Sequence, residues 1–183
     1  MADTEQFESF MRQYQDMVFS TAMRLLANQA EAEDVSQEVF LKAYERFAEL
    51  GQSPTVGGWL KTVATNLCLN HLSRYRSRWT FFSDLKTDRD DEEERELQLP
   101  SGQDLGEEIA RADQHQLVEH ALQNLPDAQR VPLVLYHLEG LSYEDIAAKL
   151  RCSLGKVKTD IFRGREALRK KLHRALNDDA CTV

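Results

Sequence analysis

Positively charged side chains crowd near the end of an otherwise acidic chain. Between Lys149 and Arg174 there are ten lysines and arginines and only two acids, a local balance of +8, whereas the whole chain of 183 residues has a formal charge of −8. Ammonium and guanidinium groups at this density can neutralise the phosphates of a nucleic acid, and such binding weakens steeply with salt. The alternative is a merely solvated surface, so the elements that carry these cations decide the interpretation.

The sequence around the cations has the pattern of a helix-turn-helix. Ser142 precedes "YEDIAAKL" and is followed three residues later by Asp145, an arrangement typical of a helix N-terminus. After the short turn "RCS", Ser153 can cap a second helix, in which apolar residues recur at three- and four-residue steps and cations flank them. A helix, a short turn and a second helix with exposed cations is the arrangement that enters the major groove of DNA. We therefore predict DNA binding here.

Helical spacing extends through most of the remaining chain. Ser53 and Pro54 suit the first positions of a helix, Gly140 suits the residue after a helix end, and Pro132 is expected to remove a backbone donor inside a helix. The apolar steps predict helices over residues 4–26, 31–48, 54–78, 107–125 and 126–140.

One segment lacks this spacing. Residues 80–105 include eight acids between Asp84 and Glu96, and a segment so charged buries too little apolar surface to offset the entropy of ordering. The sequence thus predicts an all-α protein with two small helical domains joined by an acidic flexible linker. The predicted limits are 1–79 for the N-terminal domain, 80–105 for the linker, 106–177 for the helix-turn-helix domain and 178–183 for a tail.

Composition excludes several classes of protein. The three cysteines are widely spaced and form no CxxC pair, which argues against a disulfide framework or a Cys-rich zinc site. No apolar run approaches the roughly 20 residues that span a bilayer, and the first residues are polar and acidic. We expect a cytoplasmic protein without membrane insertion, metal or cofactor.

Both ends of the chain resemble one family. "LPDAQRVPLVLYHLEGLSYEDIAAKLRCSLGKVKTDIFRGREALRKKL" resembles the C-terminal domain of the bacterial extracytoplasmic-function (ECF) sigma factors, members of the sigma-70 family. "AEAEDVSQEVFLKAYERF" is similar to the segment by which such factors grip core RNA polymerase. "GGWLKTVATNLCLNHLSRYRSR" is similar to the helix that opens the −10 promoter element.

The resemblance implies a function without catalysis of its own. Such a factor binds core RNA polymerase at the β′ clamp helices and the β flap, recognises the −10 and −35 elements of promoter DNA, and helps to melt the DNA so that transcription of a stress or envelope-type regulon begins. An anti-sigma factor is an expected further partner. Tethering two weak DNA sites through one linker would raise their joint affinity.

The resemblance also assigns site residues, each set with a physical reason. An acidic, polar helix face suits a basic partner surface, Asn offers both a donor and an acceptor to an unstacked base, and cations follow the backbone. The polymerase-binding residues would be Asp34, Gln37, Glu38 and Phe40. The −10 DNA-binding residues would be Lys61, Asn66, Asn70, Arg74, Arg76 and Arg78, and the −35 DNA-binding residues Ser153, Lys156, Lys158, Thr159 and Arg163.

One departure from the family pattern lies in the predicted recognition helix. Asp160 stands where relatives commonly carry a cation. We expect it either to weaken a phosphate contact or to accept a hydrogen bond from a cytosine amino group.

Two other functions compete with this interpretation. A conventional helix-turn-helix regulator would bind duplex DNA by itself, without core polymerase. A nucleic-acid-processing enzyme is the second alternative, but the chain holds no HExxH motif, P-loop or paired-carboxylate arrangement. Cys68 and His71 are one helical turn apart, yet two ligands are too few for a metal site.

Overall fold

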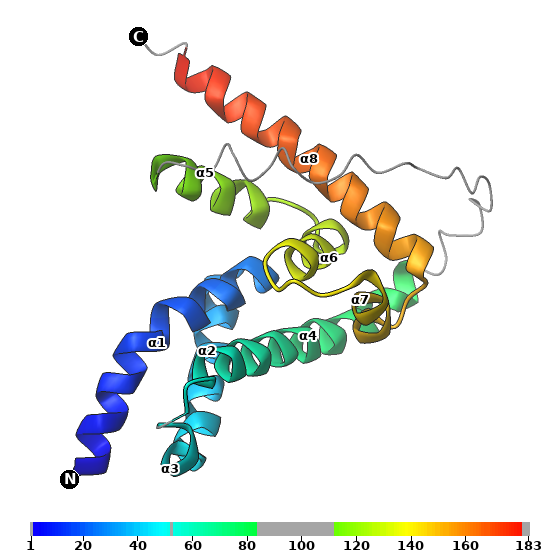
Figure 1. Ribbon diagram of the computed structural model, residues 1–183. Helices are drawn as coiled ribbons and strands as arrows, with labels where there is room; N and C mark the ends of the chain where they lie inside the picture. The colour runs from blue at the N-terminus through cyan, green and yellow to red at the C-terminus, as the bar shows by residue number, and fades with distance from the viewer. Residues whose placement is uncertain (1, 52, 84–111, 181–183) are drawn as a thin grey trace. The chain divides into compact units, whose positions relative to one another are not determined.

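The structure is a computed structural model that describes residues 2–51, 53–83 and 112–180, without the side chains of 2–3, 75–83, 112–115 and 176–180. Within these ranges every regular element is a helix, which confirms the all-α prediction (Figure 1). The chain divides into two compact units, residues 1–72 and 73–183. The acidic segment predicted as a linker lies almost wholly outside the described residues, and the predicted domain limits stay a prediction.

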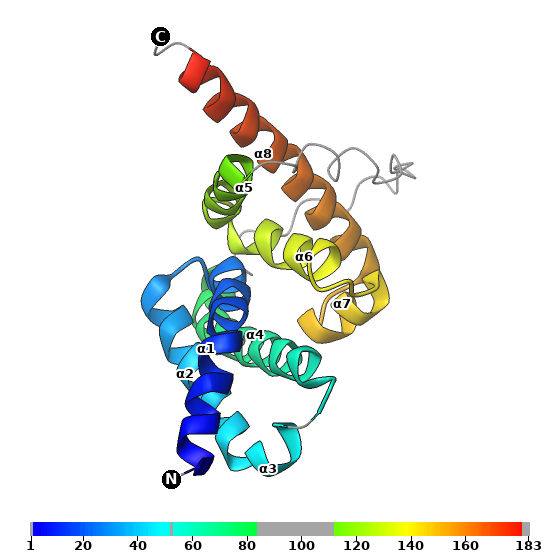
Figure 2. The same ribbon diagram turned by 60° about the vertical axis from the view of Figure 1, so that its left-hand side comes forward.

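The first unit begins with a pair of helices that run side by side in opposite directions (Figures 1 and 2). Helix α1 spans Ala2–Leu26 and α2 spans Gln29–Glu45. Ala27 takes a positive φ of 51° at the reversal, and the Asn28 side chain accepts a hydrogen bond of 3.2 Å from the Glu31 amide. This contact satisfies one of the amides that have no partner within a helix N-terminus.

The predicted helix over 31–48 is interrupted at Arg46. Its φ of −118° and ψ of 18° end α2, and a short helix α3, Phe47–Leu50, follows. Phe47 packs its ring edge-on against Phe7 and Phe10, at centroid distances of 5.1 and 5.4 Å. The break thus brings an aromatic side chain onto α1, which a continued helix would have directed elsewhere.

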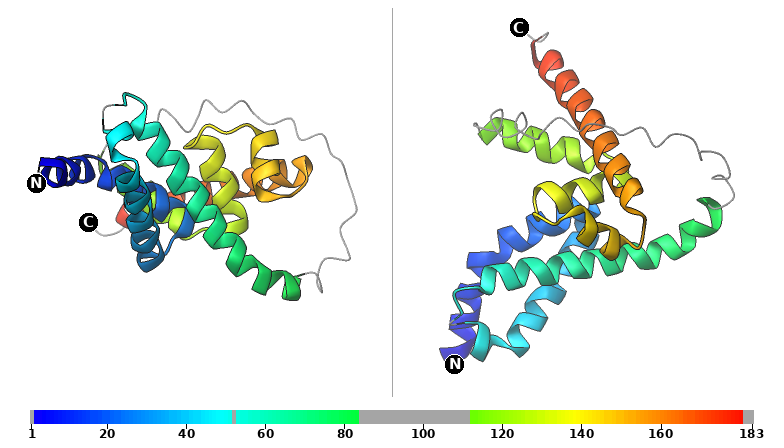
Figure 3. Two further views of the ribbon diagram at one scale, coloured as in Figure 1. Left: turned by 90° about the horizontal axis from the view of Figure 1, so that it is seen from below. Right: turned by 45° about the vertical axis from the view of Figure 1, so that its right-hand side comes forward.

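Helix α4, Val56–Ser83, completes the first unit (Figure 3). It begins after the predicted position, because Ser53 forms a turn in which its Oγ accepts from the Thr55 amide at 3.4 Å. It also extends beyond residue 78, where the sequence predicted its end. The fully buried residues of the first unit include Val18, Ala22, Leu25, Val39, Ala43, Leu60, Ala64 and Cys68.

The second unit is built on one long helix. Helix α8, Leu154–Ala180, is contacted by α5 (Ala112–Gln123), α6 (Asp127–His137) and α7 (Tyr143–Leu150), as Figures 1 and 2 show. The residues of α8 on the contact side are buried: Val157, Ile161, Gly164 and Leu168. The three- and four-residue steps predict one stripe of Val157, Ile161, Gly164, Leu168 and Leu172, and only Leu172, which is half-buried, differs from the rest. The flanking positions of α8 are free to carry cations.

Pro132 lies inside α6 without ending it. The helix continues to His137, and Pro132 is fully buried among its apolar neighbours. Because proline has no amide hydrogen, the carbonyl of Ala128 loses its donor within the helix. After the helix, Gly140 has a φ of 68°, the left-handed conformation expected of a glycine at this place.

Gly164 allows α8 to approach α6 closely. A Cβ atom at this position would lie 3.0 Å from the backbone oxygen of Gln129, whereas a Cβ at Gly155 would meet nothing within 4 Å. The backbone of Gln129 cannot move aside as a flexible side chain would. Close helix packing at Gly164 therefore depends on the missing side chain.

Replacing Gly164 by valine is expected to lower the free energy of unfolding of the second unit by about 1–3 kcal/mol, because the added atoms overpack the contact with α6. Urea unfolding followed by circular dichroism measures the change. The control, Gly155→Ala on the same helix, should leave stability unchanged or raise it by up to about 1 kcal/mol, since alanine favours helix and has space. Equal destabilisation by both variants would contradict this account of the contact.

Candidate functional site

The predicted helix-turn-helix is formed by α7, a tight turn and the N-terminal half of α8. The Ser142 Oγ accepts from the Asp145 amide at 3.1 Å and donates to the Asp145 Oδ2 at 2.7 Å, as a helix start requires. Arg151 ends α7 in the left-handed conformation, with φ 52° and ψ 48°. The Ser153 Oγ then accepts from the Lys156 amide at 3.2 Å. Both predicted helix starts are therefore confirmed.

The predicted −35 contacts of α8 have different surroundings. Lys158 and Arg163 are exposed, and neither has a partner among the contacts of the described residues. The Thr159 hydroxyl donates to the Gly155 carbonyl at 3.0 Å, so only its lone pairs are left for DNA. Ser153 is exposed, but its oxygen serves as the helix cap. The structure thus offers two open cations and two side chains that already have a partner in the backbone.

Asp160 does not point toward a partner surface. The residue is only 8% exposed, and its Oδ2 lies 3.0 Å from the Lys156 Nζ one helical turn earlier. A carboxylate so little exposed and already paired offers few free lone pairs to a base, and both expectations for Asp160, a weakened phosphate contact and a cytosine contact, stay predictions. Lys156, whose side chain is 56% exposed, carries the open end of the pair.

A cluster of aromatic and basic side chains joins α6, α7 and α8. The rings of Tyr136 and Tyr143 stack at a centroid distance of 4.6 Å, and the Arg165 guanidinium lies 5.6 Å from the Tyr136 ring centroid. The Arg165 Nε donates to the His137 Nε2 at 2.9 Å. Partial burial of the ring, and then the charge of Arg165, lower the pKa of His137 from its ordinary value of 6.5. A neutral His137 is the form that can accept this hydrogen bond.

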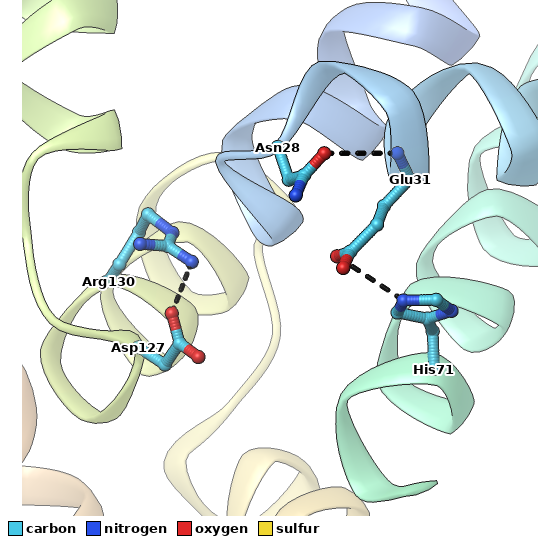
Figure 4. A network of polar contacts seen from close by, with 5 residues as sticks. All are labelled: Asn28, Glu31, His71, Asp127 and Arg130. Carbon is cyan, nitrogen blue, oxygen red and sulfur yellow. Dashed lines mark hydrogen bonds and ion pairs between the residues drawn. The ribbon is translucent and has the colours of Figure 1, made fainter. Parts of the chain in front are cut away.

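Arg130 has a structural role at the start of α6. The side chain is 3% exposed, and its guanidinium donates to the Leu125 carbonyl at 2.6 Å and pairs with Asp127 (Figure 4). The carbonyl belongs to the segment that links α5 to α6. Arg130 therefore stabilises the fold of the second unit, and its buried guanidinium is not exposed to a DNA partner.

The predicted −10 residues of α4 do not all share one face. Asn66, Asn70 and Arg74 are exposed and follow one another at four-residue steps, so each lies only about 40° around the helix from the one before. Lys61 is half-buried and lies about 140° away from Asn66. Arg76 and Arg78 belong to α4, but their side chains are outside the described part of the chain. The described face is thus two amides and one cation.

The predicted polymerase-binding residues of α2 form an exposed stripe. Asp34, Gln37 and Glu38 are exposed and lie at steps of three and four, with Glu38 3.6 Å from Lys42. Phe40 is only 9% exposed and belongs to the core. It can support this face from below, but little of its ring reaches a partner.

Two residues that the sequence analysis missed continue this stripe. Leu41 is 66% exposed and Tyr44 is 55% exposed, although both are large and apolar. Leu41 follows Asp34 by seven residues and therefore lies almost on the same line along the helix. A signal was present, since an apolar residue on the polar side of an amphipathic helix is typical of a contact surface. Acidic groups and exposed apolar side chains together suit protein docking.

Glu31 in the first turn of α2 lies beside His71 of α4. Its carboxylate lies 3.2 Å from the His71 Nε2, and its own amide donates to the Asn28 side chain (Figure 4).

The described residues form no metal site. Cys68, which the sequence analysis considered with His71 as a metal ligand, is completely buried. In the described part of the chain no group of three or more His, Cys, Asp or Glu side chains could hold a metal. None of the helices described there has the length and apolarity that a membrane crossing needs.

Two family models match the chain, one in each part of it. Residues 10–78 match sigma-70 region 2, and residues 115–168 match sigma-70 region 4. The first match contains α2 and most of α4, and the second contains the helix-turn-helix.

Similar proteins cover nearly the whole chain. The RNA polymerase sigma-H factor of Pseudomonas aeruginosa is 34% identical over 181 residues, which make up 96% of this chain and 91% of that protein. The ECF RNA polymerase sigma factor SigE of Mycolicibacterium smegmatis is 35% identical over 95% of this chain and 64% of its own length. Region 2 and region 4 together, with these relatives, define a sigma-70 factor. The chain belongs to the ECF sigma factors of that family.

One solved structure aligns with most of the chain. The sigma factor RpoE of Bartonella quintana, in complex with the anti-sigma factor NepR, is 25% identical. The alignment covers 91% of this chain and 96% of that one, with a TM-score of 0.48.

The His137 contact is expected to make stability depend on pH. The pKa of His137 is lower in the folded than in the unfolded state. Neutral His137 therefore contributes fully to the free energy of unfolding above about pH 6.5, and this contribution is lost as the pH falls toward the pKa of the folded state. Urea unfolding between about pH 5 and 8 should show that the wild type loses stability on acidification relative to His137→Gln, which keeps an acceptor but cannot titrate. Parallel pH profiles for the two proteins would contradict this role.

Proposed function

We propose that this sigma factor binds core RNA polymerase through the exposed stripe of α2 and reads promoter DNA through α4 and α8. The observation that carries the proposal is the exposed helix-turn-helix with its cations, in a chain whose other end matches sigma-70 region 2. In this arrangement α8 lies in the major groove of the −35 element and α4 engages the −10 element. The conventional regulator, which needs no region 2, has no support from the relatives.

The polymerase-binding surface is proposed to consist of Asp34, Gln37, Glu38, Leu41 and Tyr44. Acidic groups guide the approach to a basic partner, and the two exposed apolar side chains supply contact area once water is excluded. The β′ clamp helices of the core enzyme are the expected partner surface, and the β flap is the expected contact of the C-terminal domain. Phe40 supports the stripe from the core.

The −10 contact is proposed to use Asn66, Asn70 and Arg74, the three exposed residues at four-residue steps. An asparagine can both donate to and accept from the edge of an unstacked base, and the arginine can follow the phosphates. Lys61 lies on another side of the helix and therefore cannot contact the same DNA strand together with these three residues. Arg76 and Arg78 remain predicted backbone contacts.

The −35 contact is proposed to use the open cations Lys158 and Arg163 with Lys156. Lys158 and Arg163, which have no partner among the described residues, are expected mainly to fix the position of the protein on the duplex, while the few side chains that reach base edges specify sequence. Ser153 and Thr159 contribute through their hydroxyl oxygens. An anti-sigma protein that covers these surfaces, and a cytoplasmic location with the polymerase, complete the proposal; the factor itself catalyses no reaction.

The direct test is transcription in vitro. The purified chain is mixed with bacterial core polymerase and fragmented genomic DNA from its source, and the transcripts are sequenced. We expect start sites that depend on the chain and share a −10 and −35 pair. An absence of such starts, together with tight binding to duplex DNA without polymerase, would overturn the proposal in favour of the conventional regulator.

Replacing Glu38 by glutamine is expected to weaken binding to core polymerase about 5- to 30-fold, because it removes a charge at the centre of the proposed surface. The matched control is Glu8→Gln on α1. Glu8 is also an exposed acid that pairs with a cation four residues later. The distance is 4.0 Å from Glu8 to Arg12 and 3.6 Å from Glu38 to Lys42. Exposed pairs add little to stability, so both variants should fold equally well. Equal affinities of the two variants in a fluorescence titration would exclude this surface.

A further inference from the structure

Asp160 is an acid on the helix that is proposed to read the −35 element. The carboxylate of Asp160 lies 3.0 Å from the Lys156 ammonium, and the two side chains are 12% and 56% exposed. The acid therefore sits at the edge of the buried stripe, beside Val157 and Ile161, which are completely buried. Its partner reaches into solvent on the same side of the helix as Arg163. Asp160 is thus the buried partner of the pair, and Lys156 is the partner that is exposed to solvent.

Lys156 is held at two places before any DNA arrives. Its backbone amide donates to the Ser153 Oγ at 3.2 Å, and its ammonium is held by Asp160. A free lysine loses the freedom of four torsions when it is immobilised on a ligand. Here the contact with Asp160 favours one direction of the ammonium before DNA is present, although the lysine side chain stays 56% exposed. The ammonium has three hydrogens, so the contact with Asp160 leaves two for a further acceptor.

The pair also changes what Lys156 can recognise. The Lys156–Asp160 pair has a net charge of zero, so the long-range attraction between Lys156 and a phosphate is weakened. The two N–H groups of the ammonium that do not contact Asp160 are still directed outward by the pair. Lysine donating to the O6 and N7 atoms of guanine is one of the specific contacts in the major groove, whereas phosphate contacts carry no sequence information. Neutralisation together with a fixed direction favours the base edge over the phosphate.

We propose that Asp160 is a positioning residue that holds Lys156 for a guanine edge in the −35 element and withholds it from the phosphates. The inference rests on the proposed function, in which α8 reads that element. It gives this chain a determinant of promoter choice at the position where relatives commonly carry a cation. Asp160 acts through Lys156 and does not touch the DNA.

The test is a selection from a promoter library with a randomised −35 element, bound by the full chain with core polymerase and then sequenced. The wild type should prefer guanine at one position of the element. Asp160→Asn should reduce that preference about fivefold or more, because the amide cannot hold the ammonium by charge. The same variant should steepen the salt dependence by about one phosphate, since Lys156 becomes free to neutralise one. Lys156→Ala should remove the same preference without steepening the salt dependence.

Glu166→Gln is the matched control. Glu166 pairs with Arg169 at 3.2 Å on the same helix, with side chains 43% and 61% exposed, so the substitution removes an equal charge from an open pair. It should leave the base preferences unchanged. Thermal unfolding of each variant shows whether Asp160→Asn acts through stability alone; a uniform change of affinity across all sequences would overturn the inference.

The outcomes separate this inference from the proposed function. If the wild type with core polymerase selects no −35 sequence at all, the proposed function fails. If the wild type selects one and Asp160→Asn selects the same sequence with the same strength, the proposed function stands and the positioning role of Asp160 is wrong.

Discussion

The contact between the apolar stripe of α8 and its three neighbouring helices is the constraint on which the second unit depends. Val157, Ile161 and Leu168 are buried in it, and Gly164 allows the backbone of α6 to come close. Because this side of the helix must stay apolar and small, the cations are confined to its flanks and its outer side. The same packing that stabilises the unit therefore places the charge on the surface that is proposed to bind DNA. Folding and recognition are specified by one helix.

In the first unit, α2 likewise has one side buried in the core and one side exposed. One side of this helix packs Val35, Val39 and Ala43 into the core, so the opposite side is rigid and open. The Asn28 cap and the contact between Glu31 and His71 hold the helix at its beginning. A surface presented on a supported helix loses little entropy when it binds. The proposed docking to core polymerase would thus rely on the same core that stabilises the unit.

The helices and their caps could be predicted from the sequence because their signals are local. Ser142, Ser153 and Gly140 have the roles that their types and spacing indicate. The environment of Asp160 could not be predicted in this way, since a flanking position on a helix can be covered or open depending on how neighbouring helices pack. Leu41 is the opposite case, because its place on the polar side of the helix, seven residues after Asp34, already indicated exposure, and the side chain is 66% exposed.

In the turn of the helix-turn-helix, a positively charged residue, Arg151, has a positive φ. Arg151 has a φ of 52°, a conformation that glycine adopts without steric cost and that costs another residue roughly 1 kcal/mol. The chain nevertheless carries an arginine there, and this arginine is one of the ten cations between Lys149 and Arg174. Glycine at this position would relieve that cost but would remove one positive charge from the region that is proposed to bind DNA. The backbone conformation of one turn residue thus sets a cost in stability for each positive charge that the turn carries.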